Sequence, residues 1–86
     1  MYSYEIKPQL QKILNKLYKK DKAKYEAVMK KIEEILNSPN PEHYKNLRYD
    51  MKEQKGVHIG HFVLTFRIIG ETIYFDDYDH HDNIYS

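Results

Sequence analysis

A chain of 86 residues can form one small hydrophobic core, and it has no cysteine that could reinforce that core through disulfides or thiolate-bound metal. It has neither an apolar run of the roughly 20 residues that a membrane span needs nor a signal-peptide pattern, so we expect one cytoplasmic domain over residues 1–86. The net charge of +1 conceals an asymmetry: residues 1–55 hold thirteen Lys or Arg and eight acids, whereas residues 56–86 hold one Arg and five acids.

The first half of the chain predicts a strand followed by two helices. Residues 2–6 alternate aromatic or apolar with polar side chains, which is typical of a short strand. Pro8 suits a first helical turn, and apolar residues then recur at helical spacing over 10–18. Asp21 is the expected N-cap of a second helix, with its apolar stripe over 25–36. Two stripes joined by a tight break predict an antiparallel helical hairpin.

The second half predicts strands. Residues 47–51 are a short strand candidate, and the charged residues 52–55 are expected to lie outside a strand. Residues 57–69 form the longest strand region, which Gly60 interrupts at either a bulge or a hairpin turn. After a turn, residues 72–78 are expected to return as a final antiparallel strand.

The predicted order of elements is therefore β-α-α-β-β-β. Helices early in the chain and strands late in it favour an α+β fold: an antiparallel sheet of about four strands with the N-terminal helical hairpin packed on one face. Two helices can cover only one face of such a sheet. The other face stays open to solvent or to a partner, and functional residues are expected there.

Four histidines lie in two groups that antiparallel pairing could bring together, His58 with His61 and His80 with His81. Imidazole is the side chain best suited to proton transfer near neutral pH, and a pair of them suits cleavage of RNA by its own 2′-OH. The alternative is that they are polar residues on a wet sheet face. Tyr85 fits neither helical stripe, which makes it a candidate for substrate contact.

The acidic run between residues 76 and 82 offers carboxylate and imidazole ligands for a metal. No metal or other cofactor is expected, because the run matches no known ligand spacing and neighbouring strand residues such as His80 and His81 point to opposite faces. Asp76 and Asp77 are instead expected to pair with Lys or Arg, or to accept backbone hydrogen bonds.

The layout as a whole resembles the RelE/ParE toxins of toxin–antitoxin modules, and within them the YafQ-like branch of the RelE group. Three short motifs carry the resemblance: Lys55-Gly56-Val57-His58-Ile59, Phe62-Val63-Leu64-Thr65-Phe66 and His81-Asp82-Asn83-Ile84-Tyr85. The order of elements extends the likeness over nearly the whole chain.

The resemblance implies an mRNA interferase, an endoribonuclease toxin that enters the ribosomal A site and cuts mRNA there. Cleavage in such toxins needs no metal and proceeds by 2′-OH attack, which leaves a 2′,3′-cyclic phosphate. Carried onto this sequence, the resemblance makes His58 and His81 the general acid/base pair and Tyr85 the aromatic residue that orients the substrate. The implied partners are the ribosome, mRNA and a cognate antitoxin of the RelB/DinJ type that blocks the site.

Four basic residues are expected to contact RNA. Arg67 would neutralise charge that develops on the phosphate, and Arg48, Lys52 and Lys55 would bind the backbone. Two other functions remain open: a ParE-like toxin that inhibits a topoisomerase without catalysis, and an inert homologue that only binds antitoxin. The histidine pair and Tyr85 favour the nuclease, because a binding protein does not need them.

Overall fold

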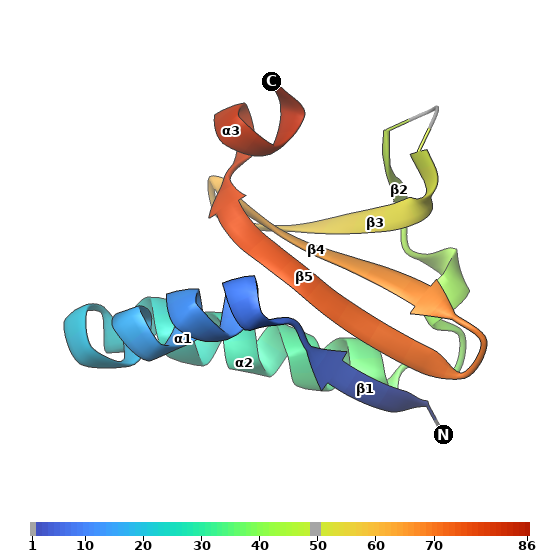
Figure 1. The fold of residues 1–86 in the computed structure, drawn as a ribbon, viewed down its shortest axis with the longest axis horizontal. Coiled ribbons are helices and arrows are strands. Elements are labelled where there is room, and N and C mark those ends of the chain that lie inside the picture. The colour runs from blue at the N-terminus through green and yellow to red at the C-terminus, as the bar shows by residue number, and fades with distance from the viewer. Residues whose placement is uncertain (1, 49–50) are drawn as a thin grey trace.

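The computed structural model describes residues 2–48 and 51–86, with the side chains of residues 51 and 52 outside the description. It has the predicted α+β fold with an N-terminal helical hairpin (Figure 1). In chain order the elements are β1 (Ser3–Ile6), α1 (Pro8–Lys20), α2 (Lys22–Asn37), the 3-10 turn η1 (Pro41–His43), β2 (Asn46–Arg48), β3 (Met51–Ile59), β4 (Phe62–Ile69), β5 (Thr72–His80) and α3 (His81–Tyr85).

The helical hairpin begins and turns where the sequence indicates. Pro8 occupies the first position of α1, where its missing N–H costs no hydrogen bond. The side chain of Asp21 accepts a hydrogen bond from the backbone N–H of Lys24 at 3.2 Å and so caps α2. In residues 2–48 and 51–86, no helix is long and apolar enough to cross a membrane.

The sheet has five strands in the order β1-β5-β4-β3-β2, one more strand than expected. The additional strand arises because Gly60 is in a hairpin turn, which divides the region 57–69 between β3 and β4. Gly60 and Gly70 each open a two-residue turn with φ near +60°, a conformation that glycine adopts without strain.

The expectation of a purely antiparallel sheet was wrong at one edge, because β1 runs parallel to β5. A two-residue turn forces its strands to be antiparallel, and it does so for β3–β4 and β4–β5. No such turn joins β1 to β5, since the helices and three strands separate them in the chain.

Two boundaries also differ from the prediction. The charged residues 53–55 belong to β3 rather than to a connector, and residues 49–50 of the predicted strand 47–51 lie outside the described residues. At the other end, β5 extends to His80 and the chain then forms the short helix α3, which was not expected.

The core lies between the helical hairpin and one face of the sheet. α1 and α2 lie together on that side, while α3 stands beyond the end of β5 on the other side (Figure 1). The buried cluster consists of Leu10, Leu14, Val28, Ile32, Ile35, Leu64, Phe66, Ile73, Phe75 and Tyr78. The face that the hairpin does not cover, here called the open face, carries alternate residues of β3, β4 and β5; His58 on β3 is exposed there, whereas Val63 and Thr65 on β4 are buried.

Candidate functional site

His58, His81 and Tyr85 meet at one end of the open face. The ring centroids of His58 and His81 are 6.4 Å apart, and the Tyr85 ring lies 6.3 Å from His58 at an interplanar angle of 20°. All three side chains are exposed. Residues from β3 and α3, more than twenty positions apart in the chain, therefore border one solvent-accessible space.

The position of α3 depends on hydrogen bonds at the end of β5. The carboxylate of Asp79 accepts from the backbone N–H of His80 at 2.7 Å and from the Asn83 side chain at 3.1 Å. Nδ1 of His80 accepts from the Asp82 backbone N–H at 3.1 Å, and the His81 N–H donates to the His61 carbonyl oxygen at 2.9 Å. These contacts fix the direction in which His81 leaves the sheet.

The ring of His81 is oriented by its neighbour in the chain. Its Nδ1 lies 2.7 Å from the Asp82 carboxylate. A carboxylate at one ring nitrogen leaves Nε2 as the nitrogen that can exchange a proton with a substrate. His61 and His80 stack with centroids 6.3 Å apart, and the His80 and His81 centroids are 5.2 Å apart, so the four histidine rings form one continuous series.

Arg67 lies apart from this cluster, and its expected role at the phosphate stays a prediction. Its guanidinium makes two hydrogen bonds to Asp76, at 2.7 and 2.9 Å, and lies over the Tyr74 ring. The hydrogen bond to Asp76 is the main cause that raises the pKa of Arg67 above its usual value. Arg67 lies four positions along β4 from Val63, the partner of His58, which corresponds to about 13 Å along the strand.

The expected contact of Lys55 with RNA stays a prediction, and in the structure the side chain has partners inside the protein. Its side chain is buried, and its ammonium donates to the carbonyl oxygens of Glu42 and Tyr44 and to the Asn46 side chain. All three ammonium hydrogens therefore have partners within 3.2 Å inside the protein. The residue links β3 to the connector after α2 through these three hydrogen bonds.

The other two basic candidates have different outcomes. Arg48 is half-buried on β2, and its guanidinium donates to the backbone oxygen of Ser86 at 3.0 Å. This contact brings a cation beside α3. The side chain of Lys52 lies outside the described residues.

His80, His81 and Asp82 could together hold a metal ion, because one ligand atom from each lies within 4.8 Å of the others. Neighbouring residues of a strand point to opposite faces, which argued against a shared ion. Because the strand ends at His80, this argument does not apply to His80 and His81. The expectation for Asp76 and Asp77 is confirmed: Asp76 pairs with Arg67, and Asp77 accepts from the backbone N–H of Tyr78.

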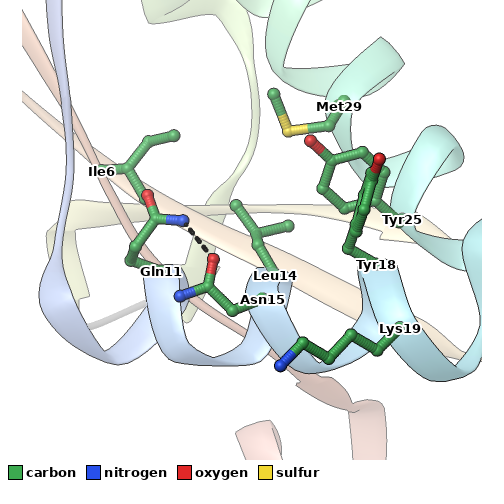
Figure 2. A pocket seen from close by; sticks show the side chains of 8 residues that line it. All are labelled: Ile6, Gln11, Leu14, Asn15, Tyr18, Lys19, Tyr25 and Met29. Carbon is green, nitrogen blue, oxygen red and sulfur yellow. Dashed lines mark hydrogen bonds between the residues drawn. The ribbon is translucent and has the colours of Figure 1, made fainter.

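A separate cavity of about 370 Å³ lies on the helical hairpin (Figure 2). Gln11 donates to Asn15 along one wall, and the rings of Tyr18 and Tyr25 meet edge to face at the other end. It shares no residue with the histidine cluster, and it holds no acid or histidine that could move a proton. We assign it no role in chemistry.

Asp79 and the carbonyl oxygen of His61 are positioning groups that the sequence analysis did not identify. The carbonyl oxygen leaves no trace in the amino-acid sequence. Asp79 had a signal, since it stands two residues before His81 at the end of a strand, where Asp commonly bonds to nearby backbone N–H groups.

The chain is similar to known proteins over its full length. It is 53% identical over 89 residues to "Putative toxin RelE4" of Methanocaldococcus jannaschii, in an alignment covering 100% of this chain and 93% of that protein. It is 46% identical over 88 residues to an uncharacterized protein of Methanosarcina mazei, covering 99% of this chain and 100% of the other. No protein-family model matches the chain.

The fold is similar to that of solved structures. The crystal structure of YafQ from Escherichia coli superposes with a TM-score of 0.66 at 20% identity, with 100% of both chains covered. The solution structure of protein HP0894 from Helicobacter pylori gives a TM-score of 0.58 at 18% identity, covering 95% of this chain and 97% of that one.

Proposed function

Because this chain belongs to the RelE family of toxins, we propose that it is the toxin of a toxin–antitoxin module and cleaves mRNA on the ribosome. The observation that supports cleavage is the meeting of His58, His81 and Tyr85 at one exposed end of the sheet. An RNA cleaved by its own 2′-OH needs one group to remove a proton and another to supply one. Two adjacent imidazoles meet that need.

The proposed reaction begins at His58. Its imidazole takes the proton of the 2′-OH, and the 2′ oxygen forms a bond to the adjacent phosphorus. The bond from phosphorus to the 5′ oxygen then breaks, and His81 donates a proton through Nε2 to that leaving oxygen. The products are a 2′,3′-cyclic phosphate and a 5′-OH end, so every proton and bond is accounted for without a metal or cofactor.

The distances among the three rings suit the roles of base, acid and stacking residue. Imidazoles with centroids 6.4 Å apart can both reach one sugar-phosphate unit. The Tyr85 ring is 40% exposed and nearly parallel to His58, so it offers a face on which a base can stack beside the reacting ribose. Arg48 lies beside α3, where its positive charge can attract the RNA backbone.

The proposed partners follow from the same surface. The ribosome would present mRNA as a single strand, whose unpaired bases a protein can reach. The cognate antitoxin would be a RelB/DinJ-like protein that covers the exposed histidines and Tyr85. Such a toxin acts in the cytoplasm, where translating ribosomes are.

The first test is expression without antitoxin, followed by mapping of mRNA 5′ ends in cells and in a purified translation system. We expect cuts at codon-spaced positions only when ribosomes are present. His81→Gln should slow cleavage at least roughly a hundredfold, the usual scale for a general acid or base. His43→Gln is the matched control, because His43 is an exposed histidine on η1 and should leave cleavage unchanged.

Two results would contradict this proposal. Cleavage by His81→Gln at the rate of the parent would remove the acid/base assignment. Growth arrest with intact mRNA and damaged DNA would indicate a ParE-like inhibitor of a topoisomerase instead.

A further inference from the structure

A second pocket, of about 410 Å³, lies on the open face next to the histidine cluster. It is lined by Thr65 at the middle of β4, by Gln54 of β3, by Asp77 of β5 and, from β2, by Leu47 and Arg48. Asn83 and Ile84 of α3 close one side, and they lie in the chain between His81 and Tyr85. The pocket and the proposed catalytic residues therefore share an element.

A β-bulge gives Asp77 its place in the pocket. Phe66 pairs with Phe75 whereas Thr65 pairs with Asp77, so Asp76 is an extra residue in β5. The bulge lets both acidic side chains serve the open face, Asp76 toward Arg67 and Asp77 into the pocket. Bulges commonly re-aim side chains beside functional sites.

The Asp77 carboxylate keeps acceptor capacity for a ligand. Its Oδ1 accepts from the Tyr78 N–H at 2.8 Å, and within the described residues no Lys, Arg or His forms a salt bridge with it. A carboxylate oxygen has two acceptor sites, so one site on Oδ1 and both on Oδ2 remain. Such a group attracts N–H donors, and the Arg48 guanidinium, which lines the same pocket and donates to Ser86, forms no salt bridge with it.

Another polar group in the pocket is the hydroxyl of Thr65. Thr65 is 2% exposed, and its hydroxyl is buried without a hydrogen-bond partner among the described residues. A buried hydroxyl left unpaired costs free energy, so this position does not contribute to the stability of the free protein. The Gln54 amide beside it can donate as well as accept.

Within the proposed nuclease function, on which this inference rests, we propose that the pocket reads one base of the RNA and prefers guanine. The Watson–Crick edge of guanine carries two neighbouring donors, N1–H and the N2 amino group, which match the two oxygens of Asp77. Its O6 is an acceptor that the Gln54 amide can reach. Adenine, cytosine and uracil each offer a carboxylate only one donor group on that edge.

The position of the pocket fits a base close to the cut. Thr65 is two residues along β4 from Val63, the partner of His58, so it lies about 7 Å from the level of the histidine. A nucleotide whose ribose lies at His58 and His81 can thus place a neighbouring base over Thr65. The acidic residue then contributes to recognition, since it faces a base rather than a phosphate.

The experiment uses ribosomes stalled with four mRNAs that differ in a single base of the A-site codon, repeated for each codon position. The parent should cut the guanine template roughly five- to a hundredfold faster than the adenine template at one position, the range for a bidentate base contact. Asp77→Asn should reverse the preference toward adenine, because an amide pairs one donor and one acceptor as the adenine edge requires.

Asp76→Asn is the matched control. It makes the same chemical change one residue away, on a side chain bound to Arg67 rather than lining the pocket, and it should keep the guanine preference. Asp77→Ser provides a second variant that should cut all four templates at similar rates.

The outcomes separate the two proposals. Cleavage by the parent without base preference, or an unchanged preference in Asp77→Asn, would overturn base reading while leaving the nuclease intact. Absence of cleavage on every template would overturn the nuclease proposal, and base reading with it.

Discussion

Tyr78 is the tyrosine that the core encloses most fully among the described residues, with 5% of its surface exposed. Its ring stacks on Phe62 with centroids 5.0 Å apart. Burial is the main cause that raises the pKa of its hydroxyl above the usual value of 10.0, and the negative charge of Asp21 adds to it. The folded protein therefore holds this proton more tightly than the unfolded chain does.

The sign of the pH effect follows from that difference. Below pH 10 the tyrosine is neutral in both states, and its full contribution to stability is present. As pH rises further, the unfolded chain ionises first, and the contribution is lost up to the raised folded pKa. We expect the free energy of unfolding to fall more steeply above pH 10 in the parent than in Tyr78→Phe. Urea titrations between pH 8 and 11 measure this, and equal slopes would contradict it.

At the level of elements, β3 is fastened to the connector after α2 by one buried cation. The Lys55 ammonium donates hydrogen bonds to Glu42, Tyr44 and Asn46. Glu42 and Tyr44 belong to no strand or α-helix, and Asn46 is the first residue of β2. Removing the ammonium leaves two backbone oxygens and an amide oxygen without their donor. Glu42 and Asn46 are exposed and Tyr44 is half-buried, so the cost comes mainly from losing hydrogen bonds made by a buried charged donor, which are stronger than neutral ones.

Lys55→Met should therefore lower the free energy of unfolding by about 3 kcal/mol, although methionine fills much of the same volume. Chemical denaturation measures the change. Lys45→Met, at an exposed position in the same connector, should change stability by less than about 0.5 kcal/mol. Equal effects of the two substitutions would show that the three hydrogen bonds contribute little.

Some of these elements could be predicted from their own residues and others could not. The helical hairpin was predictable because its apolar stripe, Pro8 and Asp21 are local signals, and each acts within one turn of helix. The predicted start of β3 was too late, because the charged side chains of Glu53 and Lys55 are typical of a loop. In the structure Lys55 is buried, and its ammonium donates to oxygens of the connector after α2 and of Asn46. The helix α3 has only five residues, and its start depends on the His80 side chain and on the carbonyl oxygen of His61 in the turn between β3 and β4.

The candidate site could be predicted only in part. His58, His81 and Tyr85 were chosen for their chemistry and by resemblance, and their roles stay predictions. The pairing of Arg67 could not be predicted, because the bulge at Asp76 provides a bidentate partner that strand alternation alone does not indicate. Asp77 gave no separate signal, because pocket walls combine residues from four strands and a helix.

At the scale of the whole molecule, the acidic second half of the chain gathers ionisable groups around the proposed site. His80, His81 and Asp82 are close enough to share a metal, yet the proposed reaction moves its protons through imidazoles and requires no Lewis acid. We expect toxin treated with a chelator, then desalted before it meets ribosomes, to cleave mRNA within about twofold of toxin that was only desalted. Loss of cleavage that zinc restores would contradict this and implicate that trio.

The pairing of β1 with β5 has a consequence for the order of folding. Ser3 pairs with Thr72, so this contact closes a loop of nearly the whole chain, whereas two-residue turns close the β3–β4 and β4–β5 hairpins. Closing a long loop costs more entropy than closing a short one, so we expect the hairpins to form early and β1 to dock late. Strands β3, β4 and β5, which carry His58 and the pocket, can thus pair before β1 joins the sheet. If β1 later detaches from β5, the pairing of these three strands stays in place.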